Sequence, residues 1–499
     1  MDTEKETKRW RILVGALVVQ IVLGTVYAFS VFVKPLQGEF GWDRTTTQLA
    51  FSFAIVTFAI TMIPAGRLQD RIGPRKVASM GGILLGISFL LGSLLVDGSR
   101  PWMLYLTYGI IGGAGIGFAY VCPIASAMKW FPDKKGLVTG LSVAGFGAGA
   151  LFFAGPASTL LLPPGGGAEA MGLSNVLLVG LGISKGSGFG IGWKMFFVLH
   201  GVTCAALVLA GASLLSNPPA GWQPRGWTLK QQQTRPAREA EWHEMLNTPL
   251  CCMLWLTFIF GATSGLMAIG QWKPLMATIL NGKTFAPSWM GNFGSFLEPV
   301  GILAIFNAMG RIFWGKVSDV IDRPRAMMIM FLAQGMAFMM LVSVHSHFAI
   351  FLASAWVGLN FGGNFALFPS ATADYFGTRN LGMNYGWIFT AYGVAGILGP
   401  IVGGVLYDAT HAYVIAFVFA GILCFIAAGS SVVVWAIARN RTESSSRAVP
   451  VLSPNPFTDI KVYPEREVPP LAELDEIPDQ ESDEKYVSHF NENKHSINN

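Results

Sequence analysis

Long apolar runs recur along the whole chain, and they constrain its fold more than any other feature. A helix needs about 20 apolar residues to cross the hydrocarbon core of a bilayer, and twelve runs have about that length. The predicted spans are 11–33, 46–66, 77–96, 101–129, 137–161, 193–215, 250–271, 295–315, 326–344, 347–372, 383–407 and 412–438. We therefore predict an all-α membrane protein with twelve transmembrane helices.

The composition excludes several other classes of protein. Hydrophobic residues make up 52% of the 499 residues and charged residues only 13%, whereas soluble chains carry about 25% charged residues. A cytosolic enzyme, a disordered chain and a nucleic-acid module are thereby excluded, and the net charge of +5 requires no polyanionic partner. The five cysteines lie mostly in apolar runs, with spacing that fits neither a disulfide framework nor a zinc site. We expect no metal and no cofactor.

Basic residues cluster in alternate connections between the predicted spans. The basic segments are 5–11, 67–76, 129–135, 316–325 and 439–441, while the opposite connections hold only scattered cations. Lys and Arg accumulate in the cytoplasmic loops of membrane proteins. We expect a multi-pass protein of the cell (inner) membrane with both termini in the cytoplasm.

Polar segments divide the chain into four parts. The basic, Pro-rich segment 216–249 is predicted to be a cytoplasmic linker between two six-helix bundles, 1–215 and 250–438. Within the first bundle, the Gly-rich segment 162–192 is predicted to form a long outer loop. Residues 439–499 lose the apolar pattern and include an acidic run, which indicates a disordered cytoplasmic tail.

The two bundles repeat each other at a nearly constant offset of 246 to 249 residues. The matched positions are Gly66 with Gly315, Asp70 with Asp319, Pro123 with Pro369, and glycines 136, 140 and 147 with 382, 386 and 393. Duplication of a six-helix unit is typical of secondary transporters, which hold substrate near the bilayer midplane between the repeats.

The repeated loop after the second and eighth spans resembles the signature loop of the major facilitator superfamily. Its glycine lets two helix ends approach closely, and Asp70 is placed to sit at a helix N-terminus and pair with a nearby Arg, which would lock one conformation. A plain positive-inside loop explains neither the aspartate nor the second copy. The predicted conformational switch consists of Gly66, Asp70, Arg71, Arg75, Gly315, Asp319 and Arg323.

Arg311 is the main candidate for binding a substrate. Asn307 precedes it by four residues, so both lie on one helix face. At the offset of 249, Arg311 corresponds to Met62, so the cation is not part of the repeated scaffold. Snorkelling of Arg311 to the headgroups is the alternative. An unpaired guanidinium suits a carboxylate, which it binds through two parallel hydrogen bonds.

Tyrosines and amides in other spans supply further candidates. Tyr120 lies in the fourth span, and Tyr392 in the eleventh corresponds to Phe146 in the repeat. Either hydroxyl would donate to a substrate carboxylate or close the cavity, with ordinary packing as the alternative. The remaining candidates for the cavity lining are Gln20, Tyr27, Asn360 and Asn364.

Four segments, in order, resemble the oxalate/formate antiporter family, the prokaryotic relatives of the monocarboxylate transporters. They are the run 24–30, the loop 129–136, the motif Asn307-x-x-Gly-Arg311 and the run 360–369, within a resemblance that covers about 8–438. The resemblance implies small carboxylates as substrates, with Arg311 as the binding arginine, Asn307 beside it, and Tyr120 matching a tyrosine of monocarboxylate-transporting members.

The chain also departs from this family at two positions. Oxalate-specific members have a lysine where this chain has Tyr392, which favours monocarboxylates over oxalate. Proton-coupled animal relatives have an aspartate where Asn307 stands, so their proton-handling pair is not reproduced.

We therefore predict a secondary transporter of small monocarboxylates such as lactate or pyruvate, operating by proton symport or anion exchange. Its expected partners are the carboxylate, protons and the lipid bilayer, without nucleic acid, and we expect a monomer. An oxalate/formate exchanger and a non-transporting carboxylate sensor remain as alternatives. We expect no enzyme, because the sequence contains neither a nucleophile–base constellation nor a phosphate-binding Gly-rich loop.

Overall fold

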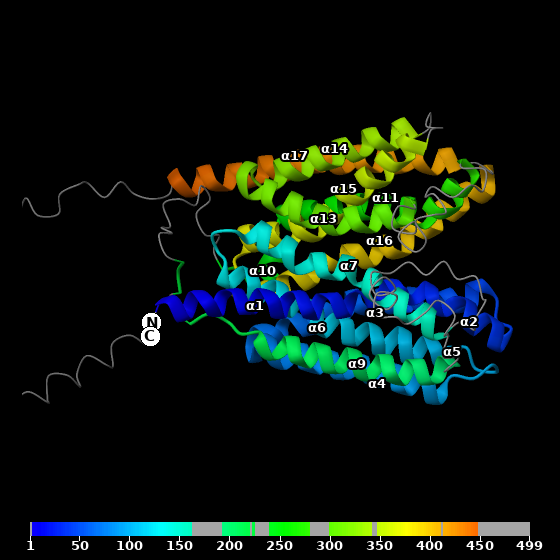
Figure 1. Ribbon diagram of the computed structural model, residues 1–499. Helices are drawn as coiled ribbons and strands as arrows, with labels where there is room; N and C mark the ends of the chain where they lie inside the picture. Colours follow the sequence, from blue (N-terminus) through cyan, green and yellow to red (C-terminus); the bar gives the residue numbers. More distant parts are fainter. Residues whose placement is uncertain are drawn as a thin grey trace, which may run out of the picture. The chain divides into compact units, whose positions relative to one another are not determined.

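Long helices running side by side make up nearly all of the chain that the computed structural model describes (Figure 1). The described residues are 2–161, 192–219, 222–224, 239–279, 299–341, 347–410 and 413–447. Nearly all of the predicted outer loop 162–192 and most of the predicted tail lie outside them.

A helix lies at each of the twelve predicted spans, and the predicted fold class is confirmed. In the first half the helical segments are α1 (Asp2–Leu23), η1 (Gly24–Phe29), α2 (Ser30–Phe40), α3 (Arg44–Ile72), α4 (Pro74–Leu95), α5 (Trp102–Leu104), η2 (Tyr105–Gly112), α6 (Gly113–Trp130), α7 (Lys135–Leu161) and α9 (Gly192–Leu214). The later segments are α10 (Trp242–Leu246), α11 (Pro249–Ile279), α13 (Pro299–Ile321), α14 (Arg323–Leu341), α15 (His347–Phe376), α16 (Leu381–Thr410) and α17 (Tyr413–Arg447). Within the described residues, ten helices are long and apolar enough to cross a membrane.

Three of the predicted boundaries differ from the structure. The first span, predicted as one helix over 11–33, is the longer series α1, η1 and α2, in which η1 has 3-10 geometry. η1 begins at Gly24, where an added Cβ would lie 2.3 Å from the carbonyl oxygen of Phe146. The 3-10 segment therefore begins where the first span crosses α7 closely. α17 continues to Arg447, past residue 438, and α10 lies inside the predicted linker. Hydropathy marks where a helix leaves the bilayer rather than where the helix ends.

The repeat in the sequence is also present in the backbone turns. The turn between α3 and α4 has a positive φ of 92° at Gly73, and Pro74 begins α4. The turn between α13 and α14 has a φ of 81° at Asp322, which lies 249 residues after Gly73. Aspartate tolerates this left-handed conformation better than most residues, and Asp322 Oδ1 accepts a hydrogen bond from the N–H of Arg325. Both halves therefore turn at the same place.

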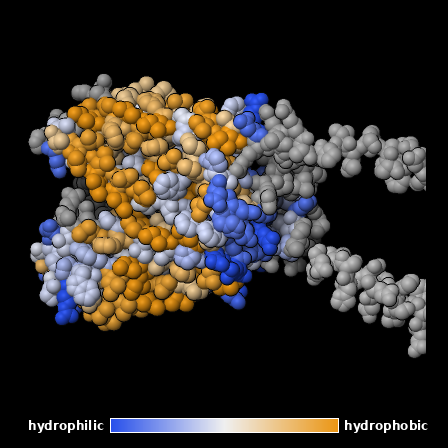
Figure 2. Space-filling view, turned by 180° about the vertical axis from the view of Figure 1, so that it is seen from behind, coloured by the Kyte–Doolittle hydropathy of each residue, from blue (hydrophilic) through white to orange (hydrophobic). Residues whose placement is uncertain are grey.

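Apolar side chains cover a broad band of the surface, while hydrophilic residues gather toward the ends (Figure 2). Residues such as Leu94 and Val320 are more than 75% exposed. Such a surface suits lipid, because the helices satisfy their backbone hydrogen bonds internally. We call the end at which α1 begins and α3 and α13 end the basic end.

Two pairs of helices carry most of the contact between the first half, through α9, and the second half, from α11 onward. α7 of the first half packs along α13 of the second, and α16 of the second half packs along α3 of the first. Figure 1 shows α14 and α17 on one side of the helix array and α4 and α9 on the other. The inner helices therefore come from both halves.

Candidate functional site

The helices of the two halves touch most closely at glycines near the basic end. A Cβ on Gly66 of α3 would lie 2.1 Å from the carbonyl oxygen of Gly382 of α16. A Cβ on Gly136 of α7 would lie 2.2 Å from the carbonyl oxygen of Gly315 of α13. Any larger residue would separate the backbones, which explains why glycine stands at these positions of the repeat.

Asp319 closes the crossing of α7 with α13, which we call the α7 contact (Asp319, Arg323, Asp374, Lys135 and Gly136). Its two carboxylate oxygens accept hydrogen bonds from the N–H groups of Gly136 and Leu137, each at 2.8 Å, in the first turn of α7. Arg323 donates to Asp319 at 2.8 Å and to Asp374 at 2.7 Å, and Lys135 lies 2.9 Å from Asp374. Two acids and two bases therefore join the halves.

Asp70 closes the crossing of α3 with α16, which we call the α16 contact (Asp70, Lys129, Gly382 and Met383). Its carboxylate accepts hydrogen bonds from the N–H groups of Gly382 at 3.3 Å and Met383 at 3.0 Å, in the first turn of α16. The expected arginine partner is replaced by Lys129, whose Nζ lies 3.6 Å from Asp70. Arg71 and Arg75 are exposed. The predicted position of an aspartate at a helix N-terminus is thus found at both crossings.

Arg311 lies deeper in the molecule and is completely buried. Its Nε donates to Asn307 Oδ1 at 3.1 Å and its Nη1 to the carbonyl oxygen of Val143 at 2.7 Å, while Nη2 has no hydrogen-bond partner. Its guanidinium carbon lies 4.3 Å from the ring centre of Phe365, and Gly147 leaves room for the group on α7.

The buried cations differ in their partners. Among the described residues they are Arg9, Lys135, Arg311 and Arg323. Arg9 pairs with Asp133, and Lys135 and Arg323 pair with carboxylates of the α7 contact. Arg311 is the one for which no carboxylate partner is present in this part of the chain, so its charge is compensated only by neutral dipoles and ring faces.

An aromatic cluster surrounds this arginine, and it brings three of the predicted tyrosines together. The hydroxyls of Tyr27 and Tyr392 lie 3.2 Å apart and link η1 to α16 across the halves. Tyr120 packs edge to face on Phe146, at 5.0 Å between ring centres, and its hydroxyl is buried without a hydrogen-bond partner. These hydroxyls come from three different helical segments.

The predicted amides do not all lie at this place. Gln20 donates from Nε2 to the carbonyl oxygen of Tyr120 at 3.0 Å, so it supports the segment that carries that tyrosine. Asn360 instead accepts a hydrogen bond from Trp314 Nε1 at 3.0 Å, and with Asn364 it lines a pocket inside the second half.

Tyr385 is a site residue that the sequence reasoning missed. It is completely buried, its hydroxyl has no hydrogen bond of normal geometry, and it is a neighbour of both Tyr120 and Arg311. A usable signal exists, because Tyr385 precedes Tyr392 by seven residues and so lies two turns away on the same helix face.

The chemistry available at this site is that of anion binding. It offers one fixed cation with a free N–H group and the neighbouring buried hydroxyls of Tyr120 and Tyr385, which make no hydrogen bond of normal geometry. Within the described ranges, His, Cys, Asp and Glu side chains form no group of three that could hold a metal ion. The arrangement can therefore bind and orient a small anion.

Known proteins similar to this chain are membrane transporters. The family model described as Major Facilitator Superfamily matches residues 15–297 and 284–463. The Oxalate:formate antiporter of Oxalobacter formigenes is 29% identical over 426 residues, 84% of this chain and 90% of the relative. Apicoplast pyruvate carrier 1 of Toxoplasma gondii is 28% identical over 369 residues, 68% of this chain and 65% of the relative.

A solved structure with the same helix arrangement is that of the E. coli fucose:proton symporter FucP. It superposes with a TM-score of 0.58 at 14% sequence identity, covering 86% of this chain and 98% of the symporter. At this identity the likeness concerns the fold alone.

Proposed function

The chain belongs to the Major Facilitator Superfamily, and on that premise we propose that it transports small monocarboxylates such as lactate or pyruvate by alternating access. The single observation that carries this proposal is the buried Arg311, whose Nη2 has no hydrogen-bond partner. A buried unpaired charge is costly, so an anionic ligand stabilises it. The names of the oxalate:formate antiporter and the pyruvate carrier support carboxylates as the ligand class.

The number of charges at the site favours a monocarboxylate over oxalate. Arg311 can neutralise one negative charge, and Tyr120, Tyr385 and Tyr392 add hydroxyls but no positive charge. A dicarboxylate would bury a second negative charge without a cation. A neutral complex of arginine and monocarboxylate also crosses between the two facings of the carrier more easily than a charged one. Oxalate/formate exchange is the second candidate, favoured by the similarity to the oxalate:formate antiporter.

The α7 and α16 contacts would act as the switch of the transport cycle. Both hold the halves together at the basic end, so release of substrate at that end requires the aspartates to leave the N-termini of α7 and α16. The residues Gly66, Asp70, Gly315, Asp319 and Arg323 would then be switch residues, with the exposed Arg71 and Arg75 beside them. Transport would proceed as proton symport or anion exchange.

The topology proposed here follows the basic segments. In the cell membrane, both termini and the linker 216–249 would lie on the cytoplasmic side. The two six-helix bundles would comprise 1–215 and 250–438, and the carrier would be a monomer. The basic residues of 67–76 and 316–325, which both lie at the basic end, support this orientation.

Uptake by purified protein in liposomes tests the proposal. Arg311→Lys keeps the charge but loses the planar fork, and Arg311→Ala loses both. We expect uptake of labelled lactate or pyruvate to fall at least about tenfold in each, since a charge-assisted hydrogen bond contributes about 1.5–3 kcal/mol. The matched control is Arg325→Lys, which changes an exposed arginine that pairs with Asp322 and lies over the ring of Trp435. Near wild-type uptake by Arg311→Ala would refute the assigned site.

Ligand-dependent thermal stability identifies the substrate class. We expect lactate or pyruvate to stabilise the wild-type protein more than oxalate does. The largest stabilisation by oxalate would favour the exchanger, and binding without accumulation in liposomes would indicate a carboxylate sensor.

A further inference from the structure

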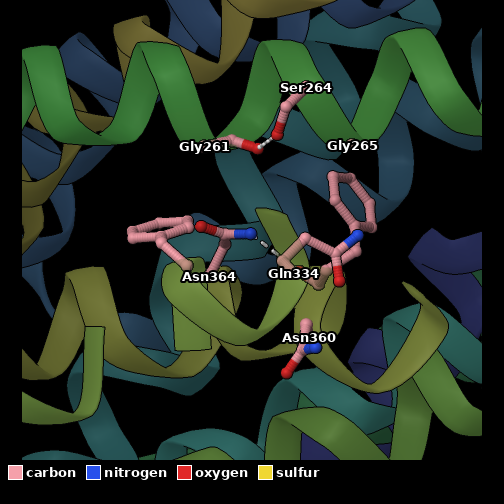
Figure 3. A pocket seen from close by; sticks show the side chains of 8 residues that line it. Gly261, Ser264, Gly265, Gln334, Asn360 and Asn364 are labelled. Carbon is pink, nitrogen blue, oxygen red and sulfur yellow. Dashed lines mark hydrogen bonds between the residues drawn. The ribbon is translucent and has the colours of Figure 1, made fainter. Parts of the chain in front are cut away.

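A small pocket lies inside the second half, between α11, α14 and α15 (Figure 3). The centre of a water-sized sphere can occupy about 10 Å³ of it, which is close to the least space that holds one water molecule. Polar groups from all three helices line it, with the rings of Phe331 and Phe361 as its apolar walls. Asn360 connects it to α13, because it accepts a hydrogen bond from Trp314, which follows Arg311 by three residues.

Three amide side chains in this pocket are buried with polar atoms unpaired. Gln334, Asn360 and Asn364 are only 4%, 1% and 2% exposed. Both amide atoms of Gln334, Nδ2 of Asn360 and Oδ1 of Asn364 have no hydrogen-bond partner. An unpaired amide group away from water costs free energy, so a ligand of matching chemistry would stabilise this pocket.

The hydrogen bonds that these amides do make fix what they present to the pocket. Asn360 Oδ1 accepts from Trp314 Nε1, which leaves its NH₂ group without a hydrogen-bond partner. Asn364 Nδ2 donates to the carbonyl oxygen of Phe361 at 3.0 Å, which leaves its carbonyl oxygen. Gln334 supplies one group of each kind, so the pocket offers two amide donors and two amide acceptors.

The balance of these groups selects the charge of the ligand. The lining contains no charged side chain. A cation would satisfy the two carbonyl oxygens but face two NH₂ groups, and an anion would have the reverse problem. A water molecule both donates and accepts hydrogen bonds, so it can pair with amide groups of both kinds.

We propose that this pocket is a binding site for a water molecule that bridges α14 and α15 beside Ser264 of α11. The site is separate from the proposed carboxylate site, because it lies within one half. It holds Asn360 in the orientation that receives Trp314 of α13. The proposal therefore does not depend on which substrate is transported.

An experimental high-resolution map of the full-length protein tests the site directly. We expect a density peak within hydrogen-bonding distance of Gln334, Asn360 and Asn364. A map in which these amides turn to bond one another, with no density between them, would overturn the proposal.

Thermal unfolding of variants tests whether the three amides share one ligand. Gln334→Leu and Asn364→Leu should each lower the melting temperature, because each leaves the other groups unpaired. The double variant should be destabilised by less than the sum, since it removes groups that depend on the same water. The matched control is the double variant of Asn364→Leu and Gln20→Leu. Gln20 lies outside this pocket and donates from Nε2 to the carbonyl oxygen of Tyr120, so the two changes in melting temperature should be additive. Additivity in the Gln334 and Asn364 pair would contradict a shared ligand.

The ion dependence of stability separates water from a cation. Melting temperatures of wild type and Gln334→Leu are compared in sodium, potassium and choline chloride at equal ionic strength. We expect the difference between the two proteins to be the same in all three salts. A sodium- or potassium-specific stabilisation that Gln334→Leu abolishes would show a cation site and refute the water site.

Discussion

The α7 contact and the α16 contact are copies of one arrangement, yet they are stabilised differently. In both, an aspartate accepts two N–H groups at the start of a helix from the other half. At Asp319, Arg323 bridges to a second acid, Asp374, which also pairs with Lys135, and each of these three ion pairs is shorter than 3 Å. Around Asp70 the one cation that the structure pairs with it is Lys129, at 3.6 Å.

The neighbouring polar groups sharpen this difference. At the α7 contact, Ser318 accepts a hydrogen bond from Arg323. The equivalent residue at the α16 contact is Gln69, which is completely buried with both amide atoms unpaired. Duplication has thus preserved the backbone geometry, which needs only glycine and aspartate, while the charges diverged.

The connecting segment supports the α16 contact in place of charges. Glu239 Oε2 accepts a hydrogen bond from the N–H of Arg379 at 2.8 Å, just before α16 begins. The carbonyl oxygen of Ala240 accepts from the side chains of Asn380 and Asn384, the latter in the first turn of α16. These are single hydrogen bonds, whereas the α7 contact contains three short ion pairs. For this reason we expect the α16 contact to open more easily than the α7 contact.

Neutralising Asp319 should have the largest effect on this pair of contacts. Asp319→Asn weakens the bond to the α7 N-terminus and leaves Arg323 and Lys135 with one carboxylate between them. Because Asp319 is partly exposed, its loss costs about 1.5–3 kcal/mol, the range for a hydrogen bond to a charged group. The state closed at the basic end is then re-formed less readily, so we expect exchange in liposomes to slow about tenfold or more. Asp322→Asn, at a half-exposed pair of the same turn, is the matched control. Unchanged exchange by Asp319→Asn would show that the loop serves topology only.

Neutralising Asp70 should have a smaller effect. Asp70→Asn loses a helix-terminus interaction of about 0.3–1 kcal/mol and one distant cation, so exchange should slow a few-fold, with binding affinity changed by no more than that. Exchange rate and ligand affinity are measured separately. If Asp70→Asn were slower than Asp319→Asn, the ranking of the two contacts would be wrong.

Removing the charge of Glu239 should have a still smaller effect. Glu239→Gln weakens one hydrogen bond to the N–H of Arg379, worth about 1 kcal/mol. We expect a modest change in the exchange rate. In the double variant with Asp70→Asn, the total effect should be smaller than the sum of the two single effects, because both residues act on the start of α16. Glu241→Gln, at an exposed helix cap, is the control, and its effect should be additive.

A helix cap at the end opposite the basic end serves as the reference for a change that should leave exchange unaffected. Asp43 caps α3, and hydrogen bonds from the Thr46 side chain and N–H hold the pKa of Asp43 below its ordinary value. A lowered pKa stabilises the folded state above the pKa of the unfolded chain, and this stabilisation is lost as the pH falls through the folded value. Asp43→Ala should therefore lower the melting temperature slightly at neutral pH but not in acid, without changing exchange. A change in exchange would mean that caps outside the two contacts also control the cycle.

The sequence by itself determined the helices and the repeat. The positions of the spans follow from local hydropathy. The constant sequence separation that relates Gly66 to Gly315 and Asp70 to Asp319 is also visible in the sequence alone. It also singled out Arg311, because a cation inside an apolar run is costly whatever surrounds it.

Only the tertiary structure decided which groups meet. Asp319 reaches N–H groups 182 and 183 residues away, and Asp70 reaches N–H groups 312 and 313 residues away. The same folding placed Lys129 rather than an arginine at Asp70, brought Tyr385 to Tyr120, and directed Asn360 toward Trp314. These outcomes depend on the rotation of each helix about its axis, which is set by packing against helices distant in sequence. Apolar periodicity is nearly absent in helices that are hydrophobic all round, so the sequence carries little record of that rotation.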